Sequence, residues 1–148
     1  MTTVHELLEA KGDSSKHSIS SQATVLEALQ LMAAENIGAV FITESTRIAG
    51  IFTERDYLRK GEVAGRKAES TPVKEVMTRN VYTVALDTSP EDCMALMNLH
   101  HIRHLPVVEK DQLMGVLSIR DVMMGLLKNK NNSAEDLERF IMGSGFSR

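Results

Sequence analysis

One short phrase occurs twice in this chain, and the repetition constrains the fold more than any other feature. GIFTERD begins at residue 50 and GVLSIRD at residue 115, which are 65 residues apart. Both read glycine, two apolar residues, a hydroxyl residue, any residue, arginine and aspartate. The same offset aligns residues 18–57 with 83–122 without a gap, and hydrophobic positions agree almost throughout. Each repeat has only about 60 residues, too few to bury a core alone, so the two should pack together.

Each repeat predicts the same order of elements. A short extended segment comes first, at 17–20 and 81–86. A helix follows, at 24–36 and 89–101, each with an N-cap signature. Two apolar strands come next, and a second helix begins at Thr53 or at Ser118. The pattern predicts an α/β (α+β) fold of two β-α-β-β-α repeats related by pseudo-twofold symmetry.

The chain divides along this pattern into four segments. The first repeat spans 1–60, a polar linker 61–72, the second repeat 73–128 and a tail 129–148. The stretch closed by Pro72 is typical of a linker. In the tail, Ser133 as N-cap and Gly143 as C-cap predict a short amphipathic helix.

Composition excludes several classes of protein. The 148 residues are 43% hydrophobic and 25% charged, ordinary values for a soluble globular protein. A net charge of −3 argues against general binding to nucleic acid or a membrane surface, which needs a basic excess. The single cysteine, Cys93, permits no internal disulfide. No signal-peptide pattern and no run of ~20 apolar residues is present, so we expect a cytoplasmic protein.

The repeated phrase has a structural and a functional interpretation. Thr53-x-x-Asp56 and Ser118-x-x-Asp121 fit a capping box. The same spacing occurs elsewhere, including at Thr3–Glu6, Thr24–Glu27, Ser89–Asp92 and Ser133–Asp136. The first two differ in following a glycine and a buried strand, and in having arginine before the aspartate. A hydroxyl, a guanidinium and a helix N-terminus favour phosphate, whereas the carboxylate suits ribose hydroxyls. A nucleotide would satisfy all of these groups together.

At this point the sequence resembles the CBS-domain family, whose tandem pairs are called Bateman modules. The resemblance rests on the element order and on the two G-h-h-[ST]-x-x-D phrases, where h is apolar, and covers the chain from about Val4 to Leu127. The segments NIGAVFI, GIFTERDYLRK, HIRHLPVVE and GVLSIRDV are most similar to small stand-alone bacterial or organellar members. It implies two clefts between the repeats, adenine nucleotide ligands (AMP, ADP or ATP, sometimes NAD(H) or S-adenosylmethionine) and a homodimer.

The resemblance also implies which residues line each cleft. Carried over by position, one cleft combines residues of the first phrase with residues of the second repeat: Thr53, Arg55 and Asp56 with Thr78, Tyr82, Ile102, Arg103, His104 and Pro106. The other combines the second phrase with the first repeat: Ser118, Arg120 and Asp121 with Ser18, Ile37, Gly38, Ala39 and Val40. The second set lacks the cations of Arg103 and His104, and no residue before Ser18 obviously matches Thr78. We therefore expect unequal sites, with the cleft of Thr53 and Asp56 the tighter.

The other candidate features, a histidine-rich segment and the single cysteine, do not indicate a metal site or a catalytic site. HHIRH (100–104) invites a zinc interpretation, but the helix should end inside it and no Glu or Cys completes a ligand set nearby. Phosphate contact by Arg103 and His104, or simple solvation, suits these residues better. Cys93 falls on the apolar face of a helix, which predicts a buried core residue and not a nucleophile. No catalytic motif is present, so we expect a non-enzyme without a catalytic cofactor or metal.

These observations predict a sensor module. Nucleotide would favour one arrangement of the repeats, which a regulated protein reads in trans. The alternative is a structural interaction and dimerisation module whose clefts hold no ligand.

Overall fold

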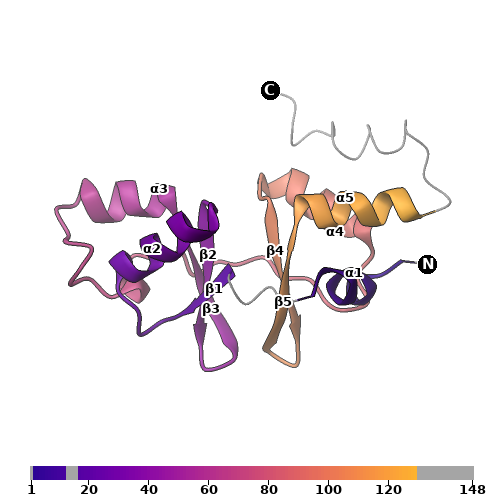
Figure 1. The fold of residues 1–148 in the computed structure, drawn as a ribbon, viewed down its shortest axis with the longest axis horizontal. Helices are drawn as coiled ribbons and strands as arrows, with labels where there is room; N and C mark the ends of the chain where they lie inside the picture. The colour runs from indigo at the N-terminus through magenta and orange to yellow at the C-terminus, as the bar shows by residue number, and fades with distance from the viewer. Residues whose placement is uncertain (1, 13–16, 130–148) are drawn as a thin grey trace. The chain divides into compact units, whose positions relative to one another are not determined.

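The computed structural model describes residues 2–12 and 17–129. In chain order the elements are α1 (Val4–Lys11), β1 (Ser18–Ser20), α2 (Val25–Glu35), β2 (Ala39–Glu44), β3 (Arg47–Thr53), α3 (Glu54–Asp56), the π-helix η2 (Tyr57–Glu62), the 3-10 helix η3 (Val73–Glu75), α4 (Pro90–His100), β4 (His104–Glu109), β5 (Gln112–Ser118) and α5 (Ile119–Lys128) (Figure 1). This mixture of helices and strands confirms the α+β class. The predicted tail helix lies outside the described residues.

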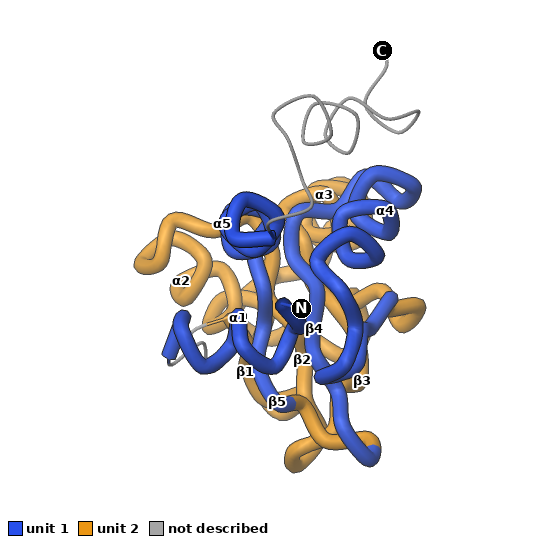
Figure 2. The backbone as a smooth tube through the Cα atoms, turned by 90° about the vertical axis from the view of Figure 1, so that its right-hand side faces the viewer, with its two compact units in different colours: residues 1–14, 82–110, 114–148 blue, residues 15–81, 111–113 orange. Residues whose placement is uncertain are grey.

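The described residues form two compact units, which Figure 2 draws in blue and orange. Unit 1 comprises 2–12, 82–110 and 114–129, and unit 2 comprises 17–81 and 111–113. The units are therefore a different division of the chain from the sequence repeats. Helix α1, which begins the first repeat, belongs to unit 1, and the segment 73–81, which begins the second, belongs to unit 2.

Unit 2 is built on a three-stranded sheet. Strand β2 pairs in parallel with β1 and antiparallel with β3. Helix α2 packs against β2 and begins with the predicted capping box, in which Thr24 accepts from the Glu27 N–H at 3.1 Å. Its core is apolar and includes the fully buried Val40, Ile42 and Phe52. The sequence pattern predicted these elements because caps and apolar periodicity agree here.

The segment that follows the linker completes unit 2. Val73 donates its N–H to the Ala23 carbonyl at 2.9 Å, and Ile51 and Thr78 exchange backbone hydrogen bonds of 2.8 and 2.7 Å. Gly50 permits this close approach, since a Cβ there would lie 2.7 Å from the Thr78 carbonyl oxygen. The glycine of the first phrase is thus required by the pairing of Thr78 with β3.

Unit 1 contains the β4–β5 pair and helices α4, α5 and α1. Helix α1 is fixed by hydrogen bonds from the Val4 N–H to the Thr88 carbonyl and from the His5 N–H to the Leu86 carbonyl, both 2.9 Å. Leu7 of α1 packs on Gly125 of α5, where a Cβ would lie 2.8 Å from the leucine side chain. A small glycine therefore lets α1 dock closely on α5.

Several local predictions differ from the structure. Residues 81–86 form no strand, and their strand-like contact is a single parallel bridge between Val84 and Val107. The helix predicted at Thr53 is one α-turn that continues as the π-helix η2. Thr3 has the cap position of α1, but its side chain makes no capping hydrogen bond. Spacing alone cannot reveal these outcomes, because each depends on how the backbone groups find partners.

Candidate functional site

The Thr53 turn (Thr53–Asp56) joins β3 to α3 in unit 2. The Thr53 hydroxyl oxygen accepts from the Asp56 N–H at 3.1 Å, and the Thr53 N–H donates to Asp56 Oδ2 at 3.1 Å. The structural interpretation of the phrase is therefore confirmed, because this is a reciprocal capping box. The cap uses Oδ2 of Asp56, and no described hydrogen bond uses the hydroxyl proton of Thr53.

The other carboxylate oxygen of Asp56 meets donors from outside the cap. Thr78 donates its hydroxyl to Asp56 Oδ1 at 3.0 Å, and Lys60 Nζ lies 3.2 Å from the same oxygen. Asp56 is only 8% exposed, whereas the Lys60 side chain is 46% exposed. The structure thus joins Thr53, Asp56 and Thr78 in one network. Sequence reasoning missed Lys60, although its i,i+4 spacing from Asp56 was a usable signal.

Backbone donors at the start of α3 are more engaged than the sequence suggested. The Glu54 N–H donates to the Gly38 carbonyl at 3.1 Å, and the Asp56 N–H is bound to Thr53. A phosphate would therefore find fewer free N–H groups here than at an uncapped helix start. Arg55 is exposed, and no described contact engages its guanidinium. It is the cation of the phrase that remains available to a ligand.

Unit 2 also contains the residues predicted to flank the second cleft. Ser18 lies in β1, Ile37 and Gly38 precede β2, and Ala39 and Val40 begin β2. Their predicted partners in the second phrase belong to unit 1. The combination of residues across the two repeats stays a prediction.

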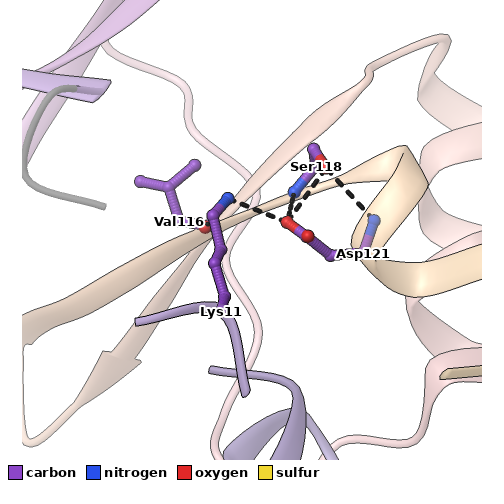
Figure 3. A network of polar contacts seen from close by, with 4 residues as sticks. All are labelled: Lys11, Val116, Ser118 and Asp121. Carbon is purple, nitrogen blue, oxygen red and sulfur yellow. Dashed lines mark hydrogen bonds and ion pairs between the residues drawn. The ribbon is translucent and has the colours of Figure 1, made fainter. Parts of the chain in front are cut away.

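The Ser118 turn (Ser118–Asp121) joins β5 to α5 in unit 1. The Ser118 N–H and hydroxyl both donate to Asp121 Oδ2, at 2.8 and 2.9 Å, and the Ser118 hydroxyl oxygen accepts from the Asp121 N–H at 3.1 Å (Figure 3). This is again a reciprocal capping box. It differs from the Thr53 turn because the hydroxyl proton is already bound to the carboxylate.

A lysine from α1 completes the Ser118 turn. Lys11 Nζ lies 2.8 Å from Asp121 Oδ2 and donates to the Val116 carbonyl at 2.8 Å (Figure 3). Burial alone would raise the pKa of Asp121, but hydrogen bonds from Lys11 and Ser118 outweigh it and hold that pKa below its ordinary value. Sequence reasoning missed Lys11, because its contact with Asp121 spans 110 residues of chain.

The remaining predicted residues of unit 1 lie in or before β4, except Arg120 in α5. Tyr82 is 45% exposed and stacks on His100, with ring centroids 3.7 Å apart. Arg103 is exposed and its carbonyl accepts from the Ile119 N–H at 2.8 Å, as Gly38 does for Glu54. Ile102 and His104 are half-buried, Pro106 is buried and Arg120 is exposed. Arg120 belongs to the predicted cleft of Ser118 and Asp121. The other residues of this group were predicted to combine with Asp56 and its neighbours, which belong to unit 2.

Cys93 is a core residue, as predicted. It is fully buried in α4, and burial, with smaller contributions from Asp92 and Glu91, raises its pKa to about 12. A thiol that holds its proton so strongly is a poor nucleophile. Within residues 2–12 and 17–129, no three His, Cys, Asp or Glu side chains form a group that could hold a metal ion.

Across the described helices, none combines the length and the apolar character needed to cross a membrane.

The two repeats, each with a hydroxyl–carboxylate turn between a strand and a helix, define a tandem α+β module. Residues 14–62 and 73–128 match the family model of the CBS domain. The chain belongs to the CBS-domain family, whose domains are regulatory modules. The resemblance seen in the sequence is thereby confirmed.

Individual relatives cover almost the whole chain. The CBS domain-containing protein CBSX3, mitochondrial, of Arabidopsis thaliana is 35% identical over 150 residues, which span 96% of this chain and 73% of that protein. The solved CBS domain NE2398 is 42% identical with a TM-score of 0.74, covering 84% of this chain and 97% of that one. The CBS domain protein PAE2072 from Pyrobaculum aerophilum, solved in complex with AMP, is 26% identical with a TM-score of 0.70, covering 95% of this chain and 99% of that one.

Proposed function

We propose that this protein is an adenine-nucleotide sensor that regulates a partner protein in trans. The observation that carries the proposal is the network of Thr53, Asp56 and Thr78 in unit 2. Asp56 is the acceptor for ribose hydroxyls, because a carboxylate accepts charge-assisted hydrogen bonds from neighbouring donors. The Thr53 hydroxyl and the Arg55 guanidinium are donors for the phosphate.

Capping alone does not require the environment of Asp56. In α2, the carboxylate of Glu27 accepts only from Thr24 among the described contacts, and both residues are exposed or half-buried. Asp56 is instead buried and bound by Thr78 from a distant part of the chain. Burying a carboxylate is unfavourable unless it is paired and hydrogen-bonded, so an exposed cap would be the simpler solution. The extra partner supports a second role for Asp56.

The relative solved with AMP supports the choice of ligand class. We propose AMP as the first ligand, with ADP, ATP and NAD(H) as alternatives of the same chemistry. Binding would act by favouring one conformation of the module over another, since a ligand shifts an equilibrium by its differential affinity for the two states. The protein carries out no reaction in this proposal and needs no catalytic cofactor.

Asp56→Asn tests the proposal. Asn can still accept from the Thr53 N–H, so the cap is retained, but the charge that binds ribose is lost. We expect AMP affinity, measured by calorimetry, to fall roughly 5- to 150-fold, the equivalent of about 1–3 kcal/mol. Asp92→Asn is the matched control, because Asp92 has the same helix position after the Ser89 cap of α4 and lies outside both turns.

Two results would count against the sensor. If Asp56→Asn lowers the melting temperature while the folded variant keeps its affinity, Asp56 is a cap only. If the wild-type protein binds no adenine nucleotide, the structural interaction module becomes the better account. In either case Asp92→Asn should bind as the wild type does.

A further inference from the structure

Thr78 donates two hydrogen bonds to residues of the first repeat, and both acceptor residues have equivalents in the second repeat. Its N–H donates to the Ile51 carbonyl at 2.7 Å, and its hydroxyl donates to Asp56 Oδ1 at 3.0 Å. The residues 65 positions further along the chain are Val116 and Asp121. Any residue that replaces Thr78 in unit 1 must therefore supply donors to these two groups.

Lys11 supplies both donors from one ammonium group. Its Nζ lies 2.8 Å from the Val116 carbonyl oxygen and 2.8 Å from Asp121 Oδ2. A cation thus stands against Asp121 where a neutral threonine stands against Asp56. Asp56 also has a cation beside it, Lys60 Nζ at 3.2 Å, so the two turns differ in which group takes the place of Thr78 and in how firmly the lysine is held.

Lys11 is held more firmly than Lys60, the lysine beside Asp56. The Lys11 side chain is 17% exposed and has two acceptors at 2.8 Å. The Lys60 side chain is 46% exposed and its two contacts are longer, 3.2 Å to Asp56 Oδ1 and 3.4 Å to Thr78 Oγ1. Lys60 lies on the helical segment after Asp56 and is free to turn into solvent with little loss. Lys11 ends a helix that is docked through Leu7 and Gly125, so withdrawing it breaks two short hydrogen bonds.

The hydroxyl group of the Ser118 turn is also less available to a ligand than that of the Thr53 turn. The Ser118 hydroxyl donates to Asp121 Oδ2 at 2.9 Å, so its proton is not available to a phosphate. In the described structure Asp121 Oδ2 accepts from Ser118 N–H, Ser118 Oγ and Lys11 together. A ribose that binds Asp121 has to compete with a cation, and a phosphate has to compete for the hydroxyl.

We propose that Lys11 inhibits nucleotide binding at the Ser118 turn by occupying Asp121. Lys11 thereby makes this turn the weaker of two nucleotide sites. The inference rests on the proposed function of the turns as nucleotide sites. The new element is the cause of the unequal affinity of the two turns, which is a side chain of α1, outside both repeated phrases. Removing the ammonium should release the carboxylate for ribose.

The test is AMP calorimetry on the wild type, Lys11→Met and Lys11→Met/Asp121→Asn. Methionine keeps the apolar stem and removes the charge. We expect Lys11→Met to strengthen the weaker site about tenfold or more, and the added affinity to disappear in the double variant. Lys60→Met is the matched control, since it neutralises the other lysine and should leave the weaker site unchanged. Lys11→Gln, neutral but polar, is the second variant should methionine impair folding.

Each outcome decides the matter. Unchanged or weakened AMP binding at the Ser118 turn in Lys11→Met rejects the proposal that Lys11 inhibits binding there. Weakened binding would identify Lys11 as a ligand contact. Failure of both neutral variants to fold would make Lys11 a structural residue and also overturn the proposal. The proposed function fails separately, through Asp56→Asn leaving AMP affinity unchanged in the same titrations. Absence of AMP binding in every variant rejects both.

Discussion

At the residue scale, Asp121 of the proposed nucleotide site also contributes to folding. Its hydrogen bonds with Lys11 and Ser118 lower its pKa in the folded protein, so its contribution to stability is present above the unfolded pKa of about 4. That contribution is lost as the pH falls through the lower, folded pKa. Because Asp121 keeps some exposure, we expect the contribution to be below about 1 kcal/mol.

Urea unfolding of Asp121→Asn measures this contribution. We expect the variant to be less stable than the wild type near pH 7 and the difference to shrink as the pH is lowered below about 4. A difference that stays constant over this range would show that the charge of Asp121 is unimportant and that the variant loses only a hydrogen-bond acceptor. Lys11→Met should reproduce most of the loss at neutral pH, since it removes the largest hydrogen-bond contribution.

Cys93 gives a second prediction at the residue scale. With a pKa raised to about 12 by burial, the thiol stays protonated at ordinary pH. We expect a thiol reagent at about pH 8 to react with the folded protein orders of magnitude more slowly than with the urea-unfolded protein. Rapid reaction of the folded protein would contradict the burial of Cys93 in α4.

At the scale of elements, the repeat predicted the fold class, the central helices with their caps and both hydroxyl–carboxylate turns. It did not predict which leading segment completes which unit. VHELL (4–8) and VKEVM (73–77) have the same apolar pattern, so both segments fit either repeat by hydrophobicity alone. The choice depends on backbone pairing, such as that of Thr78 with Ile51, which spacing does not encode.

The same limit explains why Lys11 escaped prediction. When VHELL is aligned with VKEVM, Glu9 and not Lys11 falls opposite Thr78. The structure substitutes a long side chain for a backbone N–H and a hydroxyl, which no residue-by-residue alignment reveals. Asp56 and Asp121, by contrast, were found because each ends one of the two repeated phrases, and Thr78 because the family resemblance implied it by position.

Gly50→Ala tests the docking of the leading segment. A Cβ at Gly50 would lie 2.7 Å from the Thr78 carbonyl oxygen, which is backbone and cannot turn away. We expect a loss of about 1–3 kcal/mol in the free energy of unfolding, together with weaker AMP binding because Thr78 shifts from Asp56. Chemical denaturation and calorimetry measure the two effects.

Gly61→Ala is the control for this substitution. Its Cβ would meet the Tyr57 ring at 3.1 Å, a side chain that can move, and alanine favours a helical conformation. We expect at most a small change in stability and none in affinity. If Gly50→Ala were equally mild, the pairing of Thr78 with β3 would be looser than the structure shows.

At the scale of the whole molecule, exposed apolar side chains favour a homodimer. In unit 1, Leu99 of α4 is 66% exposed, and Met124 and Leu127 of α5 are 49% and 60% exposed. Helices α4 and α5 pack together, so these side chains gather on neighbouring elements. Exposed apolar side chains on neighbouring helices favour burial against a second chain.

Light scattering on the wild type and Leu127→Glu tests the dimer. We expect the wild type to have the mass of two chains at tens of micromolar, and the charged variant to shift toward the mass of one chain. A wild-type protein with the mass of one chain at that concentration would contradict the predicted homodimer. A dimer unaffected by Leu127→Glu would assign the interface to other residues.

The central claim is that the Thr53 turn with Thr78 is a nucleotide site. Titration of the isotope-labelled protein with AMP, followed through its backbone amide resonances, tests the claim at residue resolution. The account predicts that the largest shifts occur at residues 53–56 and at Thr78, with smaller or later shifts at the Ser118 turn because Lys11 holds Asp121. An unchanged spectrum at millimolar AMP, or shifts confined to residues outside both turns, would contradict it.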